Sequence, residues 1–206
     1  MSAAAPFRLP LIAILRGLTP EDALAHVGAL ADAGYDAIEI PLNSPRWADS
    51  IGPAAQAFGQ RCWIGGGTVL QIGDVDALAD LGARFIVTPN TRPPVIRHAV
   101  ARGLQVVAGF ATATEAFDAL DAGAQMLKLF PAATYGPGHV RALRAVLPAQ
   151  VPLFVVGGVN TETLHDYLGA GAIGAGIGGE LYRPGQSLAQ TQAHAAAFRL
   201  AYLDRA

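Results

Sequence analysis

The chain of 206 residues is 52% apolar and only 15% charged, with a formal net charge of −2. This composition predicts a large folded core and excludes an intrinsically disordered protein. Because the net charge is small and no cluster of basic residues occurs, we expect neither nucleic acid nor an anionic membrane as a partner.

The other bulk features indicate one folded unit. The single cysteine, Cys62, excludes an internal disulfide and offers no cysteine framework for zinc. The N-terminus has no basic segment followed by an apolar one, and no apolar stretch reaches the roughly 18 residues of a membrane helix. We therefore expect a soluble cytoplasmic protein with a single domain over residues 1–206, since α/β barrels of this length commonly form one unit.

Along the chain, helical stretches alternate with short apolar strands. A glycine follows most of the helical stretches, as expected of a residue that accepts the left-handed conformation at a helix end. Thr19, Thr114 and Asn160 are expected to open three of these helices as capping residues. The stretches that stop at a glycine are residues 19–33, 75–81, 94–102, 114–122 and 161–170, and a last helix is expected over 188–203.

Eight apolar strands are expected, and most of them precede a helix. Strands that alternate with helices in this way predict a parallel sheet. Eight such units in about 200 residues fit a closed (β/α)8 TIM barrel. The alternative is a doubly wound open sheet, which usually carries Gly-x-Gly-x-x-Gly at its first turn, a motif that residues 15–18 do not supply. The expected strands are Leu11–Arg16, Ala37–Leu42, Trp63–Val69, Phe85–Asn90, Gln105–Phe110, Met126–Pro131, Leu153–Val159 and Ile173–Gly178.

Lys128 is the only lysine in the chain and lies in the middle of the apolar run 126–131. In a strand, Met126, Lys128 and Phe130 point to the same side. An unpaired buried ammonium group is unfavourable and usually responds with a lowered pKa, which also allows an amine to attack a carbonyl and form a Schiff base. The alternative is a structural lysine that reaches the strand end or pairs with a buried carboxylate.

Glu39 is a second charged residue inside a predicted strand, between Ile38 and Ile40. Since the two isoleucines must face the surrounding helices, Glu39 is expected to face the barrel interior, where it can approach Lys128. One interpretation is an amine nucleophile with a carboxyl group that moves its protons. The other is a buried ion pair, which adds little net stability because both groups lose water.

Two polar residues lie where strands are expected to end, which is where the active sites of such barrels are found. Arg16 presents a planar fork suited to a carboxylate or a phosphate, although the same residue can simply cover the barrel rim. Thr68 follows three glycines and can either hydrogen-bond a substrate oxygen or close a tight turn.

The last two predicted strands end in glycine pairs, Gly157-Gly158 and Gly178-Gly179. Backbone amides that glycine leaves accessible, aimed by a following helix N-terminus, form an anion site. Phosphate binding after strands seven and eight is a frequent feature of barrels. We therefore expect a phosphate site at these two loops.

The histidines give no indication of a metal site. All of them fall on predicted helices, and none has the spacing of metal ligands. We expect them on helix surfaces. They are His26, His98, His139, His165 and His194.

Several long runs resemble a known family. These runs are residues 11–17, 38–45, 86–90, 111–117 and 122–125. They are similar to the 2-keto-3-deoxy-6-phosphogluconate and 2-keto-3-deoxy-6-phosphogalactonate aldolases, which are class I lyases on a (β/α)8 barrel. The resemblance covers residues 11 to about 187 and is greatest for the phosphogalactonate branch. It implies a homotrimer that uses no metal or organic cofactor and acts on a phosphorylated 2-keto-3-deoxy sugar acid, with pyruvate as a product.

The resemblance also implies roles for individual residues. Lys128 corresponds to the Schiff-base lysine, and Glu39 to the proton donor and acceptor. Arg16 and Thr68 correspond to residues that hold the pyruvate carboxylate. The residues that line the pocket or cradle the phosphate are Pro89, Phe130, Gly157, Gly158 and Gly178.

Two positions depart from the common pattern of the family. Val156 stands where the phosphogluconate branch has a threonine before the Gly-Gly pair, which favours the phosphogalactonate epimer as substrate. Gly179 stands where the family commonly has a serine, so that a hydroxyl ligand of the phosphate is missing. The phosphogluconate epimer and 4-hydroxy-2-oxoglutarate are the alternative aldolase substrates.

Two other classes of function remain open. In a non-catalytic phosphosugar-binding barrel, Lys128 and Glu39 would form a structural pair. A barrel isomerase or decarboxylase usually carries more inward carboxylates or a second lysine on its strands, and the chain offers neither.

Overall fold

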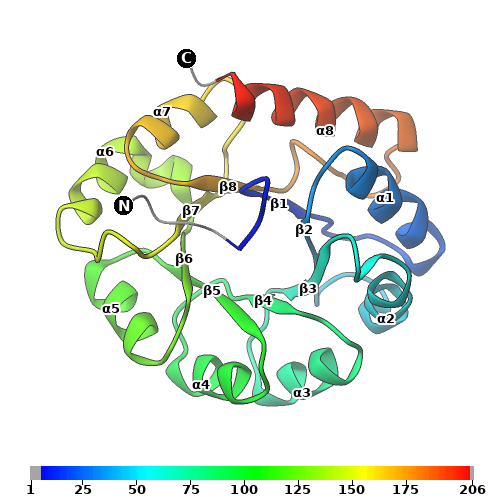
Figure 1. The fold of residues 1–206 in the computed structure, drawn as a ribbon, viewed down its shortest axis with the longest axis horizontal. Helices are drawn as coiled ribbons and strands as arrows, with labels where there is room; N and C mark the ends of the chain where they lie inside the picture. Colours follow the sequence, from blue (N-terminus) through cyan, green and yellow to red (C-terminus); the bar gives the residue numbers. More distant parts are fainter. Residues whose placement is uncertain (1–5, 205–206) are drawn as a thin grey trace.

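The computed structural model describes residues 6–204. Its eight strands are all parallel and form a closed barrel in sequence order, with the last strand paired to the first. The helices form an outer ring around the strands (Figure 1). The predicted (β/α)8 TIM barrel is therefore confirmed, and the open sheet is excluded.

Seven of the eight strands end earlier than predicted, because the chain leaves the ladder and turns toward a helix, whereas the strand 105–110 ends at the predicted residue. Arg16, Thr68 and Pro89 therefore lie in the loops that follow their strands. The strands are β1 Leu11–Ile14, β2 Ala37–Pro41, β3 Trp63–Gly67, β4 Phe85–Val87, β5 Gln105–Phe110, β6 Met126–Leu129, β7 Leu153–Val156 and β8 Gly174–Ile177. The helices are α1 Pro20–Asp32, α2 Trp47–Phe58, α3 Ile72–Asp80, α4 Pro93–Ala101, α5 Ala113–Asp121, α6 Ala132–Arg144, α7 Leu164–Gly169 and α8 Leu188–Leu203.

The barrel interior is apolar at its N-terminal end. Phe7, from the segment before β1, packs edge-on against Trp63 with the ring centroids 5.3 Å apart, and its ring also lies near Phe85 and Phe154. In Figure 1 the first described residues lie over the ring of strands. These aromatic rings fill the barrel interior at the end where the strands begin.

Glycine ends the helices where the sequence predicts it. The glycines after α1, α3, α4, α5 and α7 all have positive φ, a conformation that a side chain would strain. Their φ values are 93° at Gly34, 82° at Gly82, 77° at Gly103, 98° at Gly123 and 109° at Gly171.

The helix starts are predicted less well. Thr112, not Thr114, caps α5, with its hydroxyl accepting a hydrogen bond from the Glu115 amide. Thr19 precedes α1 but its side chain caps nothing. Asn160 accepts a hydrogen bond from the Thr163 amide at 2.8 Å within a turn, so α7 begins only after that turn. Local side-chain bonds compete with the first helical turn at these positions.

The helices α2 and α6 do not appear among the predicted helical stretches that stop at a glycine. Pro53 lies inside α2. Gly136, with a φ of 71°, and Pro137 interrupt α6. Proline and glycine inside a segment normally indicate a loop, so the sequence pattern obscures both helices.

His26 is buried, and the prediction that it lies on a helix surface is wrong. Its Nδ1 lies 2.9 Å from the hydroxyl of Thr191 on α8, and burial lowers the pKa of its imidazole. A contact between residues so far apart in sequence leaves no local signal.

Among residues 6–204, no cluster of His, Cys, Asp or Glu side chains suits a metal ion.

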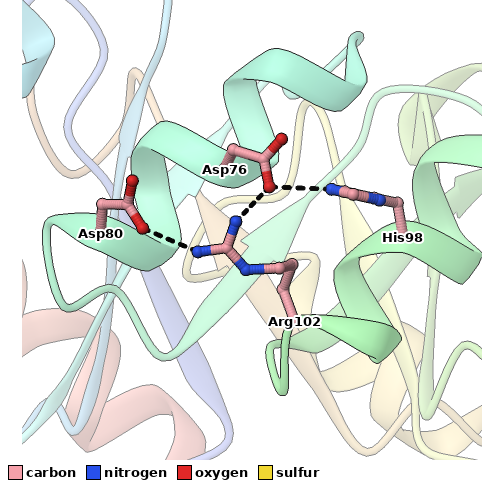
Figure 2. A network of polar contacts seen from close by, with 4 residues as sticks. All are labelled: Asp76, Asp80, His98 and Arg102. Atoms are coloured by element: carbon pink, nitrogen blue, oxygen red, sulfur yellow. Dashed lines mark hydrogen bonds and ion pairs between the residues drawn. The ribbon is translucent and has the colours of Figure 1, made fainter.

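His98 belongs to a polar network that joins α3 to α4 (Figure 2). Its Nε2 lies 2.9 Å from a carboxylate oxygen of Asp76, and Arg102 bridges Asp76 to Asp80. The bonds from His98 and Arg102 lower the pKa of Asp76. The network ties two neighbouring helices together at the surface of the barrel.

Within the described part of the chain, no helix is both long and apolar enough to cross a bilayer.

Candidate active site

Lys128 lies on β6, between β5 and β7, and only 6% of its surface is exposed. Its Nζ lies 5.3 Å from the ring centroid of Phe130. Burial lowers the pKa of the amine to about 8, against the opposing effect of Glu39, and Arg16 lowers it further. Lys128 therefore carries a sizeable neutral fraction near neutral pH.

Glu39 lies on β2 and faces the barrel interior, while Ile38 and Ile40 pack outward against the helices. Gly67, on the neighbouring β3, makes room for it, because a Cβ at that position would lie 1.9 Å from Glu39 Oε2. This oxygen is buried and has no hydrogen-bond partner among the described residues. Burial raises the pKa of the carboxyl to about 7, although Lys128 and Arg16 oppose the rise.

Lys128 and Glu39 influence each other's pKa, yet they form no ion pair among residues 6–204. Buried carboxylates without partners are rare in folded proteins. A lysine and a carboxyl whose pKa values are both shifted toward neutrality are typical of acid–base chemistry. The arrangement favours a functional pair over the structural ion pair that the sequence left open.

Arg16 lies at the open end of the barrel in the loop after β1, and its guanidinium is exposed. One of its terminal nitrogens donates a hydrogen bond of 2.7 Å to Oδ1 of Asn43. No carboxylate pairs with Arg16 among the described residues, so its charge is available to an anion. Asn43 follows the end of β2, and no sequence pattern connects it with Arg16.

Thr68 and Pro89 lie in the loops after β3 and β4. Thr68 has a φ of 58°, a costly conformation for a β-branched residue, and its hydroxyl has no partner in the described part of the chain. Pro89 packs closely on β5, because a Cβ at Gly109 would lie 2.4 Å from the Pro89 carbonyl carbon. Both residues are half-buried. Thr68 follows the strand that pairs with β2, which carries Glu39, and Pro89 packs on Gly109 of β5, which lies opposite Lys128 in the ladder.

A cavity of about 460 Å³ opens at the ends of β7, β8 and β1. Ile14, Val159, Gly176 and Glu180 line it, together with a larger group of the residues that the sequence predicted. That group consists of Arg16, Phe130, Val156, Gly157, Gly158, Gly178 and Gly179. Lys128, Glu39, Thr68 and Pro89 are not among the lining residues. Phe130 lies near Lys128, and the charge of Arg16 acts on both Lys128 and Glu39, so these two lining residues connect the central pair to the cavity.

The two glycine loops offer free backbone N–H groups. Gly157 and Gly158 have φ values of 97° and 74°, which only glycine adopts easily. No described hydrogen bond uses the N–H of Gly158, Val159, Gly179 or Glu180. Free N–H groups around a cavity suit an anion.

Neither glycine pair leads directly into a helix, although the start of the last helix at residue 188 is as predicted. α7 begins at Leu164, and α8 begins only at Leu188. After β8 the chain instead forms a single tight turn, in which the amides of Leu181 and Tyr182 donate to the Gly178 carbonyl at 2.8 and 2.9 Å. The N–H groups at this cavity therefore come from two loops rather than from a helix N-terminus.

The family described as KDPG and KHG aldolase matches residues 6–197. The chain is 57% identical over 197 residues to the 2-dehydro-3-deoxy-6-phosphogalactonate aldolase of Escherichia coli strain K12, covering 96% of each chain. It is 55% identical to a solved structure described as native KDPGal, with a TM-score of 0.96 and coverage of 100% of this chain and 98% of that one.

A more distant solved structure is the KDPG aldolase of Legionella pneumophila, with pyruvate captured at low pH as a covalent carbinolamine intermediate. It is 25% identical, with a TM-score of 0.81, and covers 95% of this chain and 93% of that one. The match over almost the whole length shows that the chain belongs to the KDPG and KHG aldolase family of carbon–carbon lyases.

Proposed function

We propose that the protein is a class I aldolase that cleaves 2-dehydro-3-deoxy-6-phosphogalactonate to pyruvate and D-glyceraldehyde 3-phosphate in galactonate catabolism. The observation that carries this proposal is the only lysine of the chain, buried with a lowered pKa in the same barrel as the unpartnered Glu39. The curated relative named for this activity, 57% identical, supports the choice of substrate.

The first half of the reaction joins the substrate to the enzyme. The neutral amine of Lys128 adds to the C2 carbonyl and forms a C–N bond, which gives a carbinolamine. The carboxyl group of Glu39 donates a proton to the C2 hydroxyl, which leaves as water when the C–O bond breaks. The product is a protonated imine that can accept electrons.

The second half breaks the carbon chain. The carboxylate of Glu39 removes the proton from the C4 hydroxyl, the C3–C4 bond breaks, and its electron pair moves through C2 to the imine nitrogen. C4 leaves as the aldehyde carbon of glyceraldehyde 3-phosphate. Protonation of the enamine at C3 restores the imine, and water then releases pyruvate and the free amine of Lys128.

The remaining site residues hold the two ends of the substrate. Arg16 and Thr68 bind the carboxylate, since one offers an unpaired guanidinium and the other a free hydroxyl. Pro89 and Phe130 line the pocket around C2. Val156 contacts the C4 side and favours the galactonate epimer. The phosphate lies against the free amides of the loops that contain Gly157, Gly158, Gly178 and Gly179.

The proposed assembly is a homotrimer, as in the resembling family. Phe117 on α5 and Tyr135 on α6 are 39% and 41% exposed, which is compatible with an apolar contact between subunits. Sedimentation velocity tests this directly. A monomer at micromolar concentration would contradict it.

The function is tested by borohydride reduction in the presence of pyruvate, followed by intact mass and peptide mapping. Because the chain has one lysine, the site of an adduct is almost unambiguous. Addition of one reduced pyruvate to the peptide that contains Lys128 is expected. Assays with the two C4 epimers and with 4-hydroxy-2-oxoglutarate then decide the substrate. Folded protein without an adduct would support the non-catalytic binding barrel instead.

Replacement of Asn43 by alanine is expected to weaken the binding of substrates whose cleavage gives pyruvate. Arg16 would lose the hydrogen bond of 2.7 Å that holds its guanidinium over the barrel end. A net hydrogen bond contributes about 0.5–1.5 kcal/mol, so KM should rise about 2- to 10-fold while kcat changes less. An unchanged KM in steady-state assays would show that Asn43 does not position Arg16.

The pKa of Lys128 is expected to lie near 8, well below the value of a solvent-exposed lysine. Protein grown with ¹³C-labelled lysine gives a single Cε resonance, since the chain has one lysine. The chemical shift of this resonance should follow the loss of the ammonium proton as the pH rises through about 8. Titration only near pH 10 would contradict the burial argument.

A further inference from the structure

The turn after β8 separates two cavities, one of which receives the substrate of the proposed reaction. Gly179 and Glu180 line the cavity of about 460 Å³ that receives the substrate. The same two residues line a neighbouring cavity of about 440 Å³, which Arg183 and His194 also line. The Gly179–Glu180 peptide therefore lies in the wall between them, with the substrate on one side and Arg183 on the other.

Arg183 holds this peptide from the outer side. Its Nε donates a hydrogen bond of 2.8 Å to the carbonyl oxygen of Gly179. The Gly179–Glu180 bond is trans, so the carbonyl and the following N–H point in opposite directions. With the carbonyl directed at Arg183, the N–H of Glu180 points away from Arg183, and it has no acceptor among the described residues.

Two further features make the hydrogen bond from Arg183 to the Gly179 carbonyl important. Gly179 has no side chain, and a Cβ there would meet nothing within 4 Å, so no side chain of residue 179 packs to hold the peptide. Glu180 places a carboxylate beside the cavity, and the guanidinium of Arg183 lies 3.5 Å from it. A charged donor on the carbonyl also polarises the amide and makes its N–H a better donor.

We propose that Arg183 is a positioning residue for the phosphate of the substrate. It fixes the Gly179–Glu180 peptide with the N–H of Glu180 directed at the phosphate, and it offsets the negative charge of the Glu180 side chain. The proposal deepens the proposed function and rests on it.

The test compares 2-dehydro-3-deoxy-6-phosphogalactonate with the same sugar acid without its phosphate. Arg183→Met should raise KM for the phosphorylated substrate about 2- to 10-fold, the cost expected for a solvent-exposed hydrogen bond, with kcat nearly unchanged. The kcat/KM for the unphosphorylated substrate should not change. Arg183→Lys should recover part of the loss, because it keeps a charged donor. Arg97→Met, an exposed arginine on α4 across the barrel, is the matched control and should behave as the wild type.

An equal loss for both substrates would show that Arg183 only supports the fold, and an unchanged KM would show that it does not position the peptide. Wild-type protein that cleaves both substrates equally well would also overturn the proposal. Borohydride trapping with pyruvate, which has no phosphate, separates this result from the proposed function. Trapping that fails in the wild type contradicts the aldolase, whereas trapping that succeeds without the expected KM change contradicts only the role of Arg183.

Discussion

Replacement of Lys128 by methionine is expected to abolish cleavage and to leave the fold intact. Lys128 is the only amine on any strand, so no second residue can form the imine. Removal of a covalent nucleophile typically costs on the order of 10⁶-fold in kcat. Borohydride and pyruvate should then give no adduct on the peptide that contains residue 128.

Stability measurements provide the control for this variant. Methionine fills a similar volume and removes a buried amine that is charged below its pKa, so the free energy of unfolding at pH 7 should stay equal or increase. Normal thermal unfolding with no adduct would assign the loss to chemistry. Cleavage that persists at more than a trace level would disprove the role of Lys128 as the nucleophile.

The two central residues could be predicted because each breaks a local rule. Lys128 interrupts an apolar strand, and Glu39 occupies the inward position between two outward isoleucines. The period of two residues in a strand is enough to place both inside the same barrel. Burial of the strand also predicts the lowered pKa of Lys128, whereas the raised pKa of Glu39 depends on the absence of a close partner and appears only in the structure.

The supporting residues could not be predicted in the same way. The role of Gly67 depends on the register between β2 and β3, which brings it against Glu39. Asn43 and Arg183 act through hydrogen bonds to Arg16 and to a backbone carbonyl, and neither bond leaves a spacing pattern. Sequence reasoning finds residues whose chemistry conflicts with their surroundings, whereas it misses residues that orient others.

The effect that Lys128 and Glu39 have on each other's pKa gives a chemical reason for the absence of a close ion pair between them. A close ion pair would raise the pKa of Lys128 and lower that of Glu39, which would leave the amine charged and the carboxyl ionised. With the two groups apart and both desolvated, the pKa values are about 8 and about 7. Each group can then change its protonation state during a catalytic cycle near neutral pH.

Replacement of Glu39 by glutamine should lower kcat about 10²- to 10⁴-fold, the usual contribution of a positioned acid–base group. The amide keeps the shape of the side chain beside Gly67 but cannot accept or donate the protons of the cycle. The adduct with pyruvate should still form on Lys128, more slowly, because the amine itself is intact. Glu21→Gln, which changes an exposed carboxylate on α1, is the matched control.

The same variant tests the electrostatic coupling through the single lysine resonance. The negative charge of Glu39 favours the ammonium form and raises the pKa of Lys128 against the effect of burial. Its removal should therefore move the titration of Lys128 to a pH below that of the wild type. A large loss of kcat without a shift in the Lys128 titration would mean that Glu39 acts without facing the amine. A shift to lower pH with less than a tenfold loss of kcat would mean that Glu39 affects Lys128 only through its charge, and that another group transfers the protons.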